Sequence, residues 1–224
     1  AAANPATMTD VKMSTMRIDV GGELFNPPRE VKHNSVLLPA NEKSGSNLFL
    51  IPNMGGIYKF NRKMYVGMAA IGAGSNTRYN QSVPACNDGN PGTVGSYFFN
   101  FSCNSSDTVG VNLLQMQMLP SVAYKLNKNH SIGASLALAV QSFRAYGIQS
   151  FAVLGYTASG TTENFSNRGN DFSYGAGIRL GWLGKFFSNR VKLGVNYSSR
   201  VYMTKFDKYK NLFAEQGSFD IPEN

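Results

Sequence analysis

The residue types that most often carry out catalysis are few in this chain and lie far apart in it. His33 and His130 have no paired nucleophile at a recognisable spacing, and the 13 Asp and Glu residues are dispersed. Neither histidine has metal-ligand spacing to Cys86 or Cys103. We therefore expect no enzyme activity, no metal site and no cofactor.

The chemistry that the chain does offer is the binding of an apolar molecule. The segment 144–170 is rich in large apolar and aromatic residues, and a long loop of this kind must pack against something or bind something. A guanidinium at its start suits a carboxylate, because it donates two parallel hydrogen bonds. The predicted substrate-binding set is Arg144, Tyr146, Ile148, Phe151, Val153, Leu154 and Tyr156. The alternative is a loop that folds over the protein beneath it, and the two can coexist.

The two cysteines lie close together in a stretch rich in Gly, Asn and Ser. Cys86 and Cys103 are placed for one local disulfide, which would indicate an oxidising compartment. The alternative is a pair of free thiols in a loop.

The dominant pattern of the sequence is a two-residue alternation of apolar and polar side chains. In the stretch from 191 to 203, Leu193, Val195 and Tyr197 alternate with Gly194, Asn196 and Ser198. Successive side chains of a β-strand point to opposite faces, so this stretch has one apolar face and one polar face. Seven segments share the pattern, at roughly 12–21, 47–60, 64–73, 112–126, 131–143, 171–183 and 191–203.

The lengths of these segments and of their connections favour a membrane barrel. A tilted membrane-spanning strand needs about 9–11 residues, whereas strands of soluble proteins average about 5–6. Short turns near 62, 128 and 189 alternate with long connections at roughly 22–46, 74–111 and 144–170. Outer-membrane barrels have short periplasmic turns and longer extracellular loops. The fold class predicted is therefore all-β, an antiparallel transmembrane β-barrel.

Three further features fit this fold. Tyr58, Phe60, Tyr124 and Trp182 precede the short turns on the apolar parity, where an interfacial aromatic girdle lies. No run of about 18 apolar residues exists, which excludes a transmembrane helix. The net charge of +8 comes from scattered residues without a basic stripe, so we expect no nucleic-acid binding.

The polar parity should face the lumen of the barrel. The lumen-facing residues predicted are Arg179, Arg200, Asn196, Gln115 and Gln117, with the two arginines in a charge network rather than on the ligand. Gly175, Gly177 and Gly181 leave room for a plug or ligand, or serve the twist of the sheet. Pro52 and Pro120 lie inside strands and cannot donate to a ladder, so we predict a bulge or a break in pairing at each.

Several motifs in register resemble the FadL-type outer-membrane transporters of long-chain fatty acids and other hydrophobic compounds. Ala3-Asn4-Pro5-Ala6-Thr7-Met8 is similar to the element that ends their N-terminal hatch. Ile51-Pro52-Asn53-Met54, Leu119-Pro120-Ser121-Val122 and Tyr174-Gly175-Ala176-Gly177 are similar to parts of their strands, in the same order. The resemblance spans nearly the whole chain.

The resemblance implies a barrel of about 14 strands with a hatch in its lumen. Residues 1–10, including Asn4, Pro5 and Ala6, would end the hatch, and 11–224 would form the N-terminal half of the barrel. Cargo would be captured by extracellular loops and released sideways where the third strand kinks. Gly72 and Gly74 are the lateral-gate candidates, the alternative being the plain start of a loop.

The leading hypothesis is thus a passive outer-membrane channel of a Gram-negative bacterium. Its cargo would be a long-chain fatty acid or another hydrophobic molecule, and it would act as a monomer among outer-membrane lipids and lipopolysaccharide. One alternative is a general diffusion porin or adhesin-like barrel, although the apolar 144–170 segment argues against a porin. Another is a soluble lipocalin-like carrier, which the long connections contradict.

Overall fold

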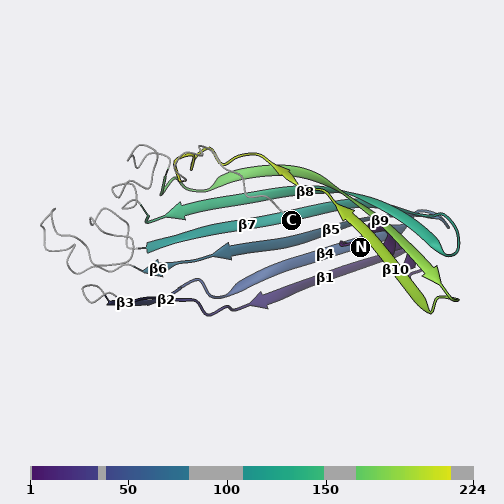
Figure 1. The fold of residues 1–224 in the computed structure, drawn as a ribbon, viewed down its shortest axis with the longest axis horizontal. Helices are drawn as coiled ribbons and strands as arrows, with labels where there is room; N and C mark the ends of the chain where they lie inside the picture. The colour runs from purple at the N-terminus through teal and green to yellow at the C-terminus, as the bar shows by residue number, and fades with distance from the viewer. Residues whose placement is uncertain (1, 35–38, 81–107, 149–164, 213–224) are drawn as a thin grey trace, which may run out of the picture.

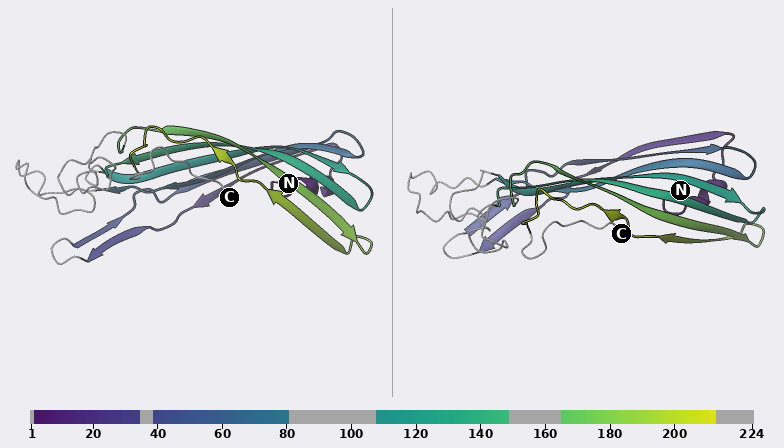
Figure 2. Two further views of the ribbon diagram at one scale, coloured as in Figure 1. Left: turned by 45° about the horizontal axis from the view of Figure 1, so that its top comes forward. Right: turned by 90° about the horizontal axis from the view of Figure 1, so that it is seen from above.

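One curved antiparallel sheet dominates the computed structural model, which describes residues 2–34, 39–80, 108–148 and 165–212 (Figure 1). Its main strands are hydrogen-bonded in the order β1-β4-β5-β7-β8-β9-β10. The elements are η1 (Pro5–Asp10), β1 (Met16–Phe25), β2 (Glu30–Asn34), β3 (Pro39–Lys43), β4 (Phe49–Lys59), β5 (Met64–Asn76), β6 (Tyr79–Asn80), β7 (Thr108–Lys125), β8 (His130–Tyr146), β9 (Asp171–Phe186), β10 (Val191–Ser198) and β11 (Tyr202–Met203). The sheet twists and curves across its width (Figure 2).

The seven predicted segments correspond to the seven main strands, and the fold class of an antiparallel β-barrel is confirmed. Every strand pair in the sheet is antiparallel, and β7 extends over 18 residues. The sequence did not predict the β2–β3 hairpin, because two five-residue strands offer too few alternations to stand out. Among the described residues, no helix is long and apolar enough to cross a membrane.

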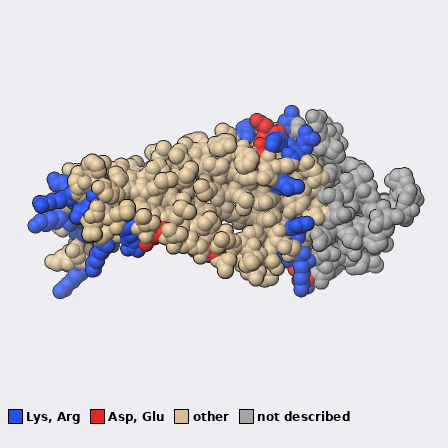
Figure 3. All heavy atoms as spheres, turned by 180° about the vertical axis from the view of Figure 1, so that it is seen from behind, with Lys and Arg blue, Asp and Glu red and all other residues tan. Residues whose placement is uncertain are grey.

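The two faces of the sheet differ as the alternation predicts. Met116, Leu136, Leu180 and Val195 are 45%, 45%, 47% and 63% exposed on the outer face. Figure 3 shows Lys and Arg gathered toward the two ends of the molecule, with a wide band between them that carries none. An apolar belt flanked by charged rims is the surface that a membrane-embedded barrel wall presents.

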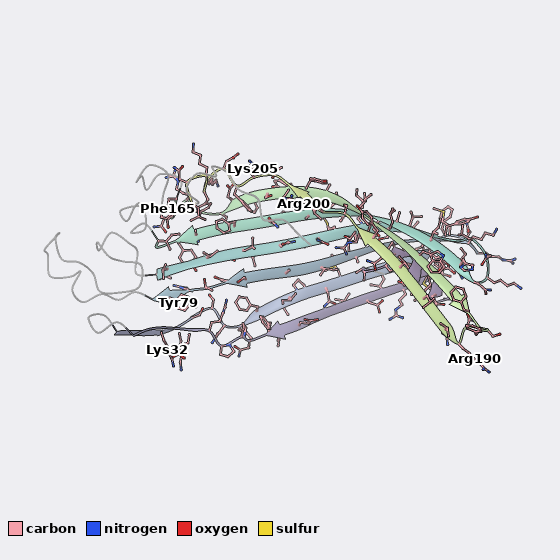
Figure 4. All side chains as sticks on the ribbon, in the orientation of Figure 1. Lys32, Tyr79, Phe165, Arg190, Arg200 and Lys205 are labelled. Atoms are coloured by element: carbon pink, nitrogen blue, oxygen red, sulfur yellow. The ribbon has the colours of Figure 1, made fainter. Side chains whose placement is uncertain are left out.

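Two of the three short turns are stabilised by the side chain of an asparagine. The Asn61 side-chain oxygen accepts hydrogen bonds from the Lys63 and Met64 amides, both at 2.8 Å. The Asn127 oxygen does the same for the Asn129 and His130 amides, also at 2.8 Å. The turn between β9 and β10 lies at this same end, where Figure 4 places Arg190, opposite Lys32, Tyr79 and Phe165.

Both prolines interrupt a ladder, as predicted. Pairing of β7 with β8 stops at Met118↔Leu138 and resumes at Ser121↔Ser135, so Pro120 falls in the break. Pairing of β4 with β5 ends at Asn53↔Ile71, immediately beside Pro52. A proline has no amide hydrogen to donate, which accounts for both interruptions.

A bulge follows β10 and changes which side chains face inward. Ser198 pairs with Arg179 and Tyr202 pairs with Ala176, so the β10 side of the pair carries one extra residue. One inserted residue inverts the alternation beyond it. Val201 is consequently only 3% exposed against Leu119, Ala137 and Ala139, although its parity in the sequence placed it outside.

Candidate functional site

The N-terminal segment lies against the inner face of the sheet and is fixed there by Asn4. The Asn4 side-chain oxygen caps η1 by accepting from the Ala6 amide at 3.0 Å. Its amide nitrogen donates to the carbonyl oxygens of Trp182 at 3.1 Å and Val195 at 3.2 Å. One side chain therefore holds together the helical turn, β9 and β10.

Glycines on three strands make room for this segment. A Cβ atom on Gly67 would lie 2.6 Å from the Met8 sulfur. A Cβ atom on Gly133 would lie 2.6 Å from the Ala6 nitrogen, and one on Gly181 would lie 2.0 Å from the Asn4 side-chain oxygen. Real Cβ atoms do not approach other atoms this closely, so Gly181 serves to seat the segment.

Gly175 and Gly177 accommodate a different neighbour. A Cβ atom on Gly175 would lie 2.1 Å from the Met203 sulfur, and one on Gly177 would lie 3.1 Å from the Ser199 hydroxyl. These two glycines therefore admit the bulged chain after β10 onto the inner face.

An acidic residue at the end of η1 ties the segment to the wall. Asp10 forms salt bridges with Lys185 and with Lys192, the latter at 2.7 Å, and these lysines face each other across β9 and β10. Partial burial acts to raise the pKa of Asp10, but hydrogen bonds and charge from Lys185 and Lys192 outweigh it, so the pKa lies below its ordinary value. Thr9 adds a hydrogen bond of 2.8 Å to the Ser131 hydroxyl.

The structure places three of the predicted lumen-facing residues on the inner face. Arg179 donates to the Ala2 carbonyl oxygen at 2.8 Å and to the Gln117 side-chain oxygen at 2.7 Å. Gln141 donates to the Gln115 side-chain oxygen at 3.2 Å. Arg179 thus contacts the N-terminal segment and a neighbouring strand.

The other two predicted lumen-facing residues differ from each other. Asn196 alternates in phase with Gly194, which approaches the Asn4 amide nitrogen, so it belongs to the inner set. Arg200 does not: it lies in the bulge, exposed, between two residues that approach Gly177 on the inner face (Figure 4). Because of the inserted residue, the alternation of β10 does not place Arg200 with the inner set.

The wall has a window between β4 and β5. Below the window the strands pair up to Asn53↔Ile71. Above that point, the remainder of β4 pairs with β1 and the remainder of β5 pairs with β7. The chains meet again where the Gly45 amide donates to the Arg78 carbonyl oxygen at 2.7 Å and the Arg78 amide donates to Ser44 at 3.2 Å.

The local sequence explains the position of this window. Pro52 offers no amide hydrogen to β5, and Gly72 and Gly74 carry no side chains to fill the space. A Cβ atom on Gly72 would lie 3.3 Å from the Pro52 ring, so the two lateral-gate candidates line the edge of the window.

An apolar cavity of about 520 Å³ occupies the window. Its lining includes residues of the outer parity, such as Leu50 and Met116, and of the inner parity, such as Ile51 and Ala73. Lining from both faces is what a passage through the wall requires. None of the lining residues is charged; they are Phe49, Leu50, Ile51, Pro52, Gly72, Ala73, Gly74, Leu114, Gln115, Met116, Val140 and Ser142.

The predicted substrate-binding set does not come together in the part that the structure describes. β8 stays in register with β7 through Tyr146, so Arg144 and Tyr146 lie on the outer face, with the guanidinium 5.2 Å from the tyrosine ring centroid. Ile148 instead packs against the inward cluster of Phe143, Ala145, Phe206 and Tyr209. No bulge precedes Arg144, so the regular alternation of β8 keeps it on the outer face. Phe151, Val153, Leu154, Tyr156 and both cysteines, Cys86 and Cys103, lie outside the described residues.

Sequence reasoning missed Asp10 and the two lysines that it contacts. It also missed Gly67 and Gly133, which make room for the N-terminal segment. Asp10 follows the Asn-Pro-Ala element by only a few residues, and Lys185 and Lys192 flank the last short turn. Nothing in the sequence indicated that Asp10 reaches these lysines.

These features define the class of protein: the wall of an antiparallel β-barrel with a short N-terminal segment on its inner face and a window between two strands. The structure is similar to the crystal structure of the toluene transporter TodX of Pseudomonas putida, with a TM-score of 0.65 and 18% identity over 91% of this chain and 51% of that one. It is also similar to a TodX deltaS2S3 mutant, described as a monoaromatic hydrocarbon channel, with a TM-score of 0.65, 14% identity and coverage of 92% and 51%.

The chain thus spans about half, 51%, of the length of these transporter chains. Comparison with protein-family models finds no match, and neither does comparison with curated proteins. At 14–18% identity the likeness establishes the fold, and it confirms the fold that the resemblance to FadL-type transporters predicted.

Proposed function

We propose that this protein is a Gram-negative outer-membrane channel for the passive uptake of hydrophobic molecules, which leave it sideways through the window between β4 and β5. The observation that carries the proposal is the uncharged cavity of about 520 Å³ in that window, within a wall whose outer face is apolar. A molecule in this cavity passes from the lumen to the acyl chains of the bilayer without crossing water, which favours an apolar cargo.

The N-terminal segment supports a sideways route. η1 packs on the inner faces of β5, β7, β8 and β9, and it is tied to the wall by Asn4 and Asp10 near the short-turn end. In our proposal residues 1–10 end a hatch that obstructs the axial path, and the residues from 11 onward form barrel wall with long extracellular connections. A blocked axis leaves the window as the exit.

The lining of the window bears on the class of cargo. Toluene and monoaromatic hydrocarbons are the compounds named for the similar structures. The cavity offers no cation to a carboxylate, so it fits a neutral hydrocarbon or the tail of an amphiphile. Our proposed cargo is therefore a hydrophobic small molecule, with long-chain fatty acids as the amphiphilic candidates.

Filling the window tests this function. Cells that express the protein from its complete gene should take up labelled toluene and oleate faster than cells without it. Gly72→Phe places a ring in the cavity and should lower uptake about tenfold, a barrier increase of about 1.4 kcal/mol. Ala134→Phe, on the outer face of β8 away from the window, is the matched control and should leave uptake unchanged. Equal uptake with and without the protein would contradict transport; equal uptake by both variants would contradict the lateral route alone.

A further inference from the structure

A row of polar side chains crosses the outer face of the sheet at the upper edge of the apolar band. Asn76 of β5 faces Asn112 of β7, which in turn faces Arg144 of β8. Toward the short turns, the next outward residues on these strands include Leu114, Met116 and Val140. The row therefore lies where acyl chains give way to headgroups, on the side of the long connections.

Two guanidiniums meet around one tyrosine in this row. Arg144 stacks over the Tyr146 ring at 5.2 Å, and the Tyr146 hydroxyl donates to the Thr77 carbonyl oxygen at 2.8 Å. Arg78 follows Thr77 directly, and the charges of Arg78 and Arg144 both act on the Tyr146 hydroxyl. No described carboxylate forms a salt bridge with either arginine.

The row also holds hydrogen-bond acceptors in need of a donor. The side-chain oxygens of Asn76 and Asn112 are buried and have no hydrogen-bond partner among the described residues. An unsatisfied buried acceptor is costly, so a side-chain rotation that turns these oxygens toward a donor from outside the chain would be favourable.

We propose that this row binds the phosphorylated saccharide headgroup of an outer-leaflet lipid, the headgroup chemistry of lipopolysaccharide. Phosphate oxygens accept paired hydrogen bonds from Arg78 and Arg144, because a guanidinium matches phosphate geometry. Hydroxyl and amide groups of the sugar donate to Asn76 and Asn112. The acyl chains then lie on the apolar band below. The inference rests on the proposed function for the presence of a bilayer at the outer face.

At the opposite end of the wall, three lysines have partners on the inner face. Lys185 and Lys192 are neutralised by Asp10, and the Lys125 ammonium donates to the Tyr65 hydroxyl at 3.0 Å. These lysines and their partners belong to the inner face. No described carboxylate neutralises Arg78 or Arg144, and in the proposed site the lipid phosphate supplies their counter-ion.

Lipid binding by the purified protein, expressed from its complete gene, tests the site. Native mass spectrometry in detergent would compare adducts of lipid A with adducts of phosphatidylglycerol at equal concentration. Arg144→Gln and Arg78→Gln should each weaken lipid A binding about tenfold, the loss expected for a charge-assisted hydrogen bond. Lys128→Gln removes the same charge at the opposite end and should bind as the wild type does.

Asn112→Leu keeps every charge and separates the saccharide contact from simple charge attraction. It should weaken the binding of lipid A and leave that of phosphatidylglycerol unchanged. Equal lipid A binding by the arginine variants and by Lys128→Gln would overturn the inference, as would wild-type protein that binds phosphatidylglycerol as well as lipid A. Toluene uptake by Arg78→Gln and Asn112→Leu should stay at the wild-type level, so a loss of lipid selectivity is distinguished from a loss of transport.

Discussion

Two joints of the wall contain a proline in mid-strand, yet only one of them opens. At the β7–β8 joint, pairing resumes within three residues of the break beside Pro120. At the β4–β5 joint, the strands pair from Asn53 onward, and pairing does not resume on the other side of Pro52, toward the long connections. A missing amide hydrogen is common to both joints, so it cannot by itself decide whether a sheet parts.

Packing on the lumenal side distinguishes the two joints. Behind the β7–β8 joint, Leu119 is only 1% exposed, and Ala137, Ala139 and Val201 pack with it. η1 also contacts both strands of that joint. At the β4–β5 joint the edge is formed by Gly72 and Gly74, which bring no side chains. Burial of apolar surface across the break therefore holds one joint closed, and its absence leaves the other open.

The largest effect should follow from removing the packing that closes the β7–β8 joint. Leu119→Ala leaves a cavity behind Pro120, and a buried Leu→Ala change typically costs about 2–5 kcal/mol. The free energy of unfolding in lipid vesicles, measured by urea titration, would show the loss. Leu136→Ala, on the exposed outer face of the same sheet, is the control and should cost less. If the free energy of unfolding falls by the same small amount in both variants, packing does not close the joint.

The sequence predicted the strands well because an outer face in lipid must be apolar at every second position. It also located both ladder breaks, since a proline lacks an amide hydrogen wherever it lies. It could not show that side chains pack behind the break at Pro120 and not behind the one at Pro52. That packing comes from Val201 and η1, which are distant in the chain. The inversion at Val201 was equally hidden, since an inserted residue leaves no mark in a single sequence.

The candidate site was predictable only where the type of a residue alone determined its role. Gly72 and Gly74 were proposed because they lack side chains, and the structure places them at the cavity. Asn4 was proposed because of a resemblance, and it bonds to β9 and β10. The orientations of Arg144 and Arg200 depend on whether a bulge is present, which a single sequence does not show. The contact of Asp10 with Lys185 and Lys192 depends on how η1 lies across four strands, which local patterns do not encode.

An intermediate effect on stability should follow from weakening the attachment of η1, which packs behind the β7–β8 joint. Asp10→Asn removes the salt bridges that anchor η1 and should cost about 1 kcal/mol at pH 7. Because the pKa of Asp10 is lowered in the folded protein, its contribution is present at neutral pH and is lost as the pH falls below 3.8 through the lowered value.

Urea titrations of the wild type and of Asp10→Asn at a series of pH values would check this. The two proteins should differ at pH 7 and converge in acid. Asp207→Asn, an exposed carboxylate on the chain beyond β11, serves as the matched control. A difference between the wild type and Asp10→Asn that persists unchanged below pH 3 would contradict the anchoring role of the ionised carboxylate.

The smallest effect should come from replacing the proline of the closed joint. Pro120→Val supplies an amide hydrogen where neighbouring side chains already hold the strands together, so stability should change by less than about 1 kcal/mol. Uptake of toluene should stay unchanged, because no window exists there. Pro52→Val is the informative partner: its amide can pair with β5, narrow the window and lower uptake, though less than Gly72→Phe does. Equal uptake by the two proline variants would show that the prolines are interchangeable and that the glycines alone keep the window open.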